Sequence, residues 1–219
     1  MSLSELWSLY GQNYIDALLA TWGMTLESFA IAMVLAVAVT VMRVSPLKPL
    51  RVFGDLYVQV FRNIPGIALL IIVVYALPPL KVVLPYRTCV IVATVLLGSA
   101  FGSENFMSGI NTVGVGQVEA ARSLGMSFSR ILAKIVIPQA LRSSVLPMTN
   151  LFIAVMLTTA LGSQVPLKPQ ELTGVVSYIN TRSLSGVAAF FISALGYLGT
   201  AFVVSHIGNY IDKKVRILR

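Results

Sequence analysis

A segment near the middle of the chain has residue types that suit recognition by another protein. It is polar and rich in helix formers, although the sequence on both sides is apolar. Small alanine side chains let a partner approach a helix backbone closely, and a carboxylate at a helix start is stabilised by the macrodipole and can pair with a partner's Arg. A glycine allows the backbone to leave the helix at positive φ. The pattern predicts a docking site that includes Glu119, Ala120, Ala121, Arg122 and Gly125, in a stretch that continues to Ile135 and Pro138.

The composition indicates that the rest of the chain lies in a membrane. Hydrophobic residues make up 57% of the 219 residues and charged residues only 11%, whereas a soluble domain carries about 25% charged residues. The apolar runs do not alternate as the strands of a β-barrel would, so the sequence predicts an all-α membrane protein. We expect a single transmembrane domain over residues 1–219 with about five spans: Trp22–Val44, Phe53–Leu77, Thr88–Met107, Val145–Val165 and Leu184–Ile207.

The distribution of the positive charges predicts the orientation of these spans. Most of the 16 Lys and Arg residues fall in segments that share one side if the amino terminus is outside and the carboxyl terminus is cytoplasmic. The net charge of +8 is therefore a topological signal and does not indicate a nucleic-acid partner. Residues 1–21 are expected to form an amphipathic segment on the outer membrane surface, residues 111–144 a cytoplasmic loop, and Pro166–Ser183 an outer loop.

The cytoplasmic loop is predicted to contain two short helices. Gln117–Leu124 is expected to be the first, with Gly125 ending it, and Ser127–Val136 the second. Pro138 is expected to begin a new turn before the fourth span. A helix–Gly–helix arrangement would form a rigid projection that a soluble partner could push or pull.

Ionisable residues within spans are costly and usually face a cavity or a partner. Arg62, beside Asn63, could bind a substrate carboxylate through paired donors, or could instead reach the headgroups or pair with Asp55. Glu104 is expected to be a structural partner of an Arg or of the backbone more than a substrate ligand. The chain has no GxxxxGK[ST] phosphate loop, one His and one Cys, so it is not expected to be an enzyme or to hold a metal or cofactor.

These residues resemble those of a known family. Glu119-Ala120-Ala121, Gly125, Ile135 and Pro138 have the spacing of the EAA motif of ABC importer permeases, with Ile137 where leucine is more usual. The resemblance to the polar amino-acid permeases extends over segments 61–65, 103–104, 116–126 and 138–142, and is strongest over residues 101–147.

The resemblance implies a type I ABC importer permease fold in a prokaryotic cytoplasmic membrane. Such permeases form dimers whose EAA loops dock on a pair of cytoplasmic ATPase subunits, which bind ATP and Mg, while an extracytoplasmic binding protein delivers the solute. Thr158 and Thr159 match a threonine pair of the family, and they would either line the solute path or bond back to their own helix.

Two departures from the family pattern bear on partner and solute. Met107 and Met156-Leu157 stand where many members have polar or charged residues, which favours a heterodimer with a second permease over a homodimer. The segment Phe61–Pro65 is similar to that of glutamate-type systems, so a polar or acidic amino acid, with glutamate favoured, is the expected solute. A self-sufficient secondary transporter or channel, or a non-transporting membrane scaffold, are the alternatives.

Overall fold

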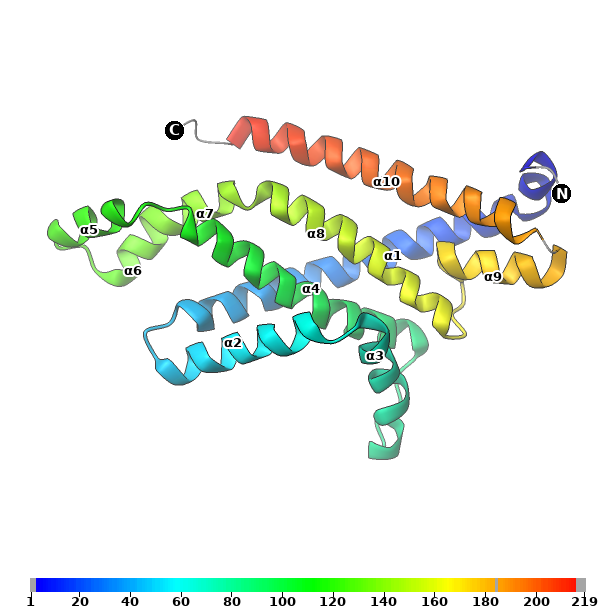
Figure 1. Cartoon of the computed structure of the whole chain (residues 1–219), viewed down its shortest axis with the longest axis horizontal. Helices are drawn as coiled ribbons and strands as arrows, with labels where there is room; N and C mark the ends of the chain where they lie inside the picture. Colours follow the sequence, from blue (N-terminus) through cyan, green and yellow to red (C-terminus); the bar gives the residue numbers. More distant parts are fainter. Residues whose placement is uncertain (1–2, 184, 216–219) are drawn as a thin grey trace.

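The computed structural model describes residues 3–183 and 185–215, and the elements found there are helical (Figure 1). In chain order they are α1 Leu3–Val44, α2 Lys48–Asn63, α3 Gly66–Ile71, the π-helix η1 Ile72–Ala76, the 3₁₀ turn η2 Pro78–Leu80, α4 Tyr86–Asn111, α5 Val115–Ser123, α6 Phe128–Ile131, the π-helix η3 Leu132–Val136, α7 Ile137–Ser143, α8 Val145–Thr158, the 3₁₀ segment η4 Thr159–Gln164, α9 Leu172–Ser183 and α10 Gly186–Val215.

Four helical segments of the described chain are long and apolar enough to cross a membrane, and a bent pair brings the number to five. The four are α1, α4, α8 with η4, and α10. The prediction of an all-α protein with about five spans is therefore confirmed. The expected start of the fifth span, Leu184, lies outside the described residues, and α10 continues beyond the expected end to Val215.

The second span differs from the straight helix that was expected over Phe53–Leu77. The chain turns by 102° between Lys48–Asn63 and Gly66–Leu80. Pro65 disfavours the helical conformation of the residue before it, and Ile64 is extended, with φ −82° and ψ 127°. As a result, α3 and the turns after it leave the direction of α2 and pack beside the start of α4 (Figure 1).

The first helix is longer than the expected span. At about 1.5 Å per residue, its 42 residues are roughly twice as long as the ~30 Å hydrocarbon layer of a bilayer. No break separates the expected surface segment from the span. Leu6 and Tyr14 of this first part are buried against α9 and the start of α10, and the Tyr14 hydroxyl donates to the Ala189 carbonyl at 3.1 Å. The segment thus packs against the protein.

Helices α1 and α4 form the centre of the molecule, and small residues set their spacing. A Cβ atom on Gly102 would lie 2.9 Å from the Cβ of Ala36, and one on Gly98 would lie 3.2 Å from that of Ala32. Both alanines have no exposed surface. Small residues let two membrane helices approach closely enough for extensive dispersion contacts.

A helix, α9, occupies much of the region predicted to be the outer loop Pro166–Ser183. The carboxylate of Glu171, which has no exposed surface, accepts the backbone N–H groups of Thr173 and Gly174, both at 2.6 Å, at the start of this helix. The Tyr197 hydroxyl of α10 donates to the same carboxylate at 3.0 Å. Burial raises the pKa of Glu171, while these hydrogen bonds act in the opposite direction. Glu171 therefore joins α9 to α10.

Candidate coupling and substrate-path sites

Residues 111–144 form a helical hairpin at the end of the molecule opposite α9 (Figure 1). The first arm is α5, and Gly125 ends it with φ +76°. The Gly125 N–H donates to the Arg122 carbonyl at 2.9 Å and the Met126 N–H to the Ala121 carbonyl at 3.1 Å. These are the two hydrogen bonds of a Schellman motif, in which a residue at positive φ closes the helix. The expectation that Gly125 terminates this helix is confirmed.

The second arm continues further than the sequence indicated. The segments α6, η3 and α7 follow one another without a gap from Phe128 to Ser143, so Pro138 lies within the helical arm and does not begin a separate turn. Proline lacks an N–H and disturbs the helical ladder. The π-helical turn Leu132–Val136 directly before it changes the hydrogen-bond register there. The Gln139 side chain donates to the Gln117 side chain at 2.6 Å and ties this arm to α5.

The structure separates the predicted docking residues into an exposed and a buried group. Glu119, Ala120, Arg122, Gly125 and Pro138 are exposed. In contrast, Ala121 is only 3% exposed and packs in a small core with Val113, Ile131 and Val136, with Ile135 against it. Ala121 and Ile135 hold the two arms together, so Ala121 does not offer the docking surface that its size suggested.

The macrodipole argument for Glu119 is wrong. Helix α5 begins at Val115, which makes Glu119 its fifth residue, and α5 has no acidic residue in its first turn. The helix-dipole effect falls off beyond that turn. Within residues 3–183 and 185–215 the Glu119 side chain forms no ion pair, so its exposed carboxylate is available to a partner.

The hairpin also carries exposed apolar residues that the sequence reasoning did not select. Val115, Leu124 and Phe128 are 70%, 82% and 51% exposed. Ala120 is also exposed, and so are the charged Glu119 and Arg122. The sequence offered one signal for these apolar residues: Val115 directly follows Gly114, and Leu124 and Phe128 stand on either side of Gly125.

A cavity of about 500 Å³ lies between α4 and α8. Most of its lining is apolar, but the side chains of Thr94, Asn105, Asn150 and Thr158 are also part of it. Of the predicted substrate-path residues, Thr158 is therefore at the cavity, where its hydroxyl donates to the Ala154 carbonyl of its own helix at 2.8 Å. Thr159 is completely buried and bonds to the Met156 carbonyl.

Arg62 and Glu104 meet in an ion network beside this cavity. Glu104 lies 2.8 Å from Arg43 of α1 and 3.4 Å from Arg62 of α2, and Arg43 also contacts Asp55 at 2.8 Å. Of the alternatives considered for Arg62, pairing with Asp55 is wrong: Arg43 holds that carboxylate. The Arg62 guanidinium also lies 5.4 Å from the ring centroid of Phe101, a cavity-lining residue.

Asn63 stands apart from this network. Its side-chain amide donates to the Gln59 carbonyl of its own helix at 2.6 Å, and the residue is exposed at the end of α2. The structure therefore brings together Arg62, Glu104 and the cavity that contains Thr158, whereas Asn63 and Thr159 bond within their own helices.

Asn105 and Ser144 connect the cavity to the hairpin. The side chain of Asn105, which lines the cavity, donates to the Pro147 carbonyl of α8 at 3.0 Å. The Ser144 hydroxyl, at the end of the hairpin, lies within hydrogen-bond distance of the Asn105 carbonyl at 3.3 Å and of the Ala140 carbonyl at 2.8 Å. A Cβ atom on Gly109 of α4 would be 2.6 Å from the Ala140 carbonyl oxygen. These contacts join the base of the hairpin to the cavity wall.

The described helices provide four membrane spans, or five with the bent pair, and the projecting hairpin and the cavity between two spans fit a membrane permease. The chain belongs to the family described as the binding-protein-dependent transport system inner membrane component, whose pattern matches residues 28–217. It is a multi-pass inner-membrane protein, and members of this family work with a solute-binding protein and a separate ATPase.

Curated relatives cover nearly the whole chain. The glutamate transport system permease protein GluC of Corynebacterium efficiens is 33% identical, with 90% of this chain and 91% of the relative covered. The L-cystine transport system permease protein TcyB of Bacillus subtilis is 31% identical, covering 95% and 91%. A probable glutamine ABC transporter permease of the same bacterium is also 31% identical, covering 97% and 96%.

Solved structures show the same fold. A chain of a crystal structure described as an amino acid ABC transporter with histidines has a TM-score of 0.91 at 24% identity, covering 98% of this chain and 99% of that one. A chain of an inward-facing methionine ABC transporter has a TM-score of 0.74 at 20% identity, covering 99% and 100%. The expected ABC importer permease fold is confirmed.

Proposed function

We propose that this chain is the permease subunit of an ATP-driven importer of a polar amino acid, with glutamate the favoured solute. The observation that carries the proposal is the EAA-type hairpin, which is closed by a Schellman motif and linked through Ser144 and Asn105 to the cavity between α4 and α8. The names of the relatives, which include glutamate, cystine and glutamine permeases, support the solute class.

On this proposal the hairpin docks on a cytoplasmic ATPase pair that binds ATP and Mg. The exposed Glu119 and Arg122 would pair with charged residues of the ATPase. Leu124 and Phe128 would enter an apolar groove of the ATPase that lies between those charged residues. Because Gln139 ties the two arms together and a small core lies between them, the hairpin would move as one body. The amino terminus would be outside and the carboxyl terminus cytoplasmic, which places the hairpin beside the ATPase.

Arg62 is the group that we propose to bind the solute's carboxylate. Glu104 has a closer cationic partner in Arg43, at 2.8 Å, whereas Arg62 is 3.4 Å away and its side chain is 39% exposed. A solute carboxylate could thus replace Glu104 as the partner of Arg62, because the Glu104 carboxylate would still be paired with Arg43. Paired N–H donors of a guanidinium suit this recognition. Thr158 would bond the solute's polar groups, and a second permease, in a heterodimer, would complete the path.

Solute uptake and ATPase activity, measured with the assembled transporter in proteoliposomes, test both parts. Glu119→Lys should leave assembly of the spans intact but abolish stimulation of the ATPase by the loaded binding protein. Unchanged stimulation and uptake would refute the assignment of the hairpin as the coupling element. Arg62→Gln should raise the solute concentration for half-maximal uptake at least tenfold, and Arg62→Lys should restore part of the loss. Equal half-saturation in both variants and the parent would refute the role of Arg62.

A further inference from the structure

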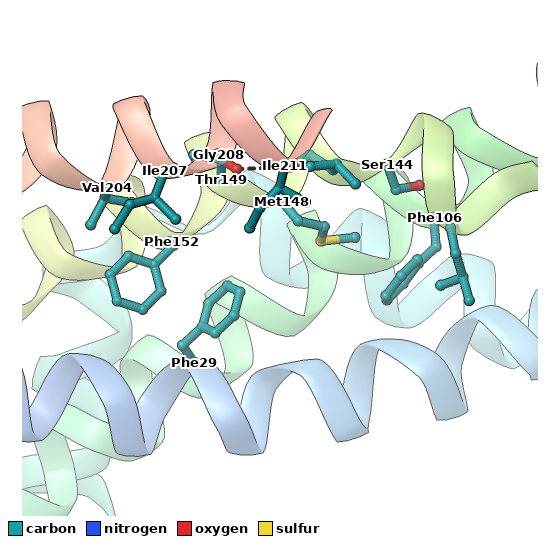
Figure 2. A pocket seen from close by; sticks show the side chains of 12 residues that line it. Phe29, Phe106, Ser144, Met148, Thr149, Phe152, Val204, Ile207, Gly208 and Ile211 are labelled. Atoms are coloured by element: carbon teal, nitrogen blue, oxygen red, sulfur yellow. Dashed lines mark hydrogen bonds between the residues drawn. The ribbon is translucent and has the colours of Figure 1, made fainter. Parts of the chain in front are cut away.

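An apolar groove runs along α10 on the side of the molecule where this helix faces α1 and α8 (Figure 2). One stretch of the groove has a volume of about 400 Å³, and Phe106, Met148, Phe152, Val204 and Ile211 are among its lining residues. A second stretch of about 330 Å³ continues past Phe152 and Val204, which line both. The two stretches together form an elongated slot between helices.

The polar atoms at the first stretch are already paired. The Ser144 hydroxyl donates to the Ala140 carbonyl and the Thr149 hydroxyl to the Val145 carbonyl, each one turn earlier in the same helix. Phe29 and Phe152 pack edge to face, with ring centroids 5.0 Å apart, and form part of the wall. The slot therefore suits a hydrocarbon chain and has no free polar group of these residues to bind an amino acid.

Helix α10 leaves the slot open toward the lipid. Only 11% of its most apolar stretch is buried in the molecule. A close approach occurs at Gly208, where an added Cβ would collide with Thr149 of α8, whereas an added Cβ on Gly199 would meet nothing within 4 Å. The helix thus packs closely on α8 near Gly208 and on α9 near Tyr197, and the space beside it between these contacts is accessible from the bilayer.

Basic residues lie next in the chain to residues that line the end of the slot near the helical hairpin. Leu141 and Ile211 line that stretch, and Arg142, Lys213 and Lys214 follow them closely along the chain. None of these three basic residues forms an ion pair with another residue in the ranges 3–183 and 185–215. An apolar slot with a cationic end matches a lipid that has a negatively charged headgroup. Basic pockets between membrane helices bind such headgroups.

We propose that this groove binds an anionic phospholipid from the leaflet next to the hairpin, with an acyl chain in the slot and the headgroup phosphate at Arg142, Lys213 and Lys214. The site is separate from the cavity between α4 and α8, and the proposal does not depend on the solute. Each basic residue near an anionic headgroup should favour binding about fivefold, and the three together roughly a hundredfold over a zwitterionic lipid.

Fluorescence quenching by brominated lipids tests the proposal. In the assembled transporter, Trp7→Phe and Trp22→Phe remove the native tryptophans of this chain, and Phe152→Trp places a reporter where the two stretches meet. The transporter is reconstituted with phosphatidylglycerol or phosphatidylcholine brominated in the acyl chains. We expect phosphatidylglycerol to quench the reporter at a mole fraction at least tenfold lower than phosphatidylcholine.

A control variant that neutralises basic residues elsewhere separates the groove from a general attraction to basic surfaces. The triple variant Arg142→Gln, Lys213→Gln, Lys214→Gln should remove the preference for phosphatidylglycerol. The double variant Lys48→Gln, Arg51→Gln, which neutralises exposed residues of α2, should retain it. Equal quenching by the two lipids in the parent would overturn the proposal, and so would loss of the preference in the control. Absence of quenching by either lipid would show that protein covers the groove, which also overturns it.

Discussion

A substitution at Gly125 would measure how much free energy the positive φ at this position costs a residue other than glycine. Its φ of +76° is in the left-handed region, and an added Cβ would meet nothing within 4 Å. Gly125→Ala should therefore introduce backbone strain without a collision. A residue other than glycine pays about 1–2 kcal/mol in this conformation, which increases local opening of the turn by a factor of roughly 5–30.

Hydrogen exchange followed by mass spectrometry on the assembled transporter measures this opening. Peptides that contain the N–H groups of Gly125 and Met126, which close the Schellman motif, should exchange faster in Gly125→Ala. Gly125→Asn should be intermediate, because asparagine tolerates the left-handed region better than alanine does.

Gly116→Ala provides the matched control. Gly116 lies in the first turn of α5, has no positive φ, and has equally open space around an added Cβ. Alanine there should be neutral or stabilise the helix by up to about 1 kcal/mol. If Gly125→Ala and Gly116→Ala gave the same exchange as the parent, the turn would not depend on the positive φ and the reasoning would be refuted.

Two further predictions concern helices α9 and α10. Glu171→Ala leaves two backbone N–H groups at the start of α9 without their acceptor and should lower stability by about 2–4 kcal/mol, seen as a lower melting temperature in detergent. Because burial raises the pKa of Glu171, the folded state binds its proton more tightly than the unfolded state. The stability contribution of this proton is greatest below the ordinary carboxyl pKa and is lost as the pH rises through the folded pKa, and Glu171→Gln should remove that dependence. Gly208→Val should lower the melting temperature because the new side chain collides with Thr149, by about 1–3 kcal/mol of stability, whereas Gly199→Val, in open space on the same helix, should change it little.

The spans could be predicted from composition because a membrane requires long apolar helices with internally paired backbones. The end of α5 was also predictable, since Gly125 follows a run of helix formers. The sharp bend between α2 and α3, called the elbow below, was not predicted. Ile64-Pro65 was its signal, but a proline within an apolar span can either kink or end a helix. The length of the apolar run did not distinguish these outcomes.

The contacts of side chains were less predictable than the elements. The sequence marked Arg62 and Glu104 as unusual within spans, but Arg43, at the end of α1, also belongs to their network. Residues far apart in the chain contact one another there, and the periodicity of apolar residues in a sequence does not predict such long-range contacts. Similarly, the pattern treated Ala120 and Ala121 as equivalent, whereas the packing of α5 buries only the second.

The elbow between α2 and α3 has a consequence for how the chain enters the bilayer during synthesis. A helix break leaves backbone groups without helical partners, and hydrocarbon offers no replacement for them. The apolar residues Leu69 and Leu70 beyond the break are buried in a cluster with Cys89 and Val90 of α4. The bent pair therefore completes its packing only together with α4, and we expect the second and third spans to integrate into the bilayer as one unit.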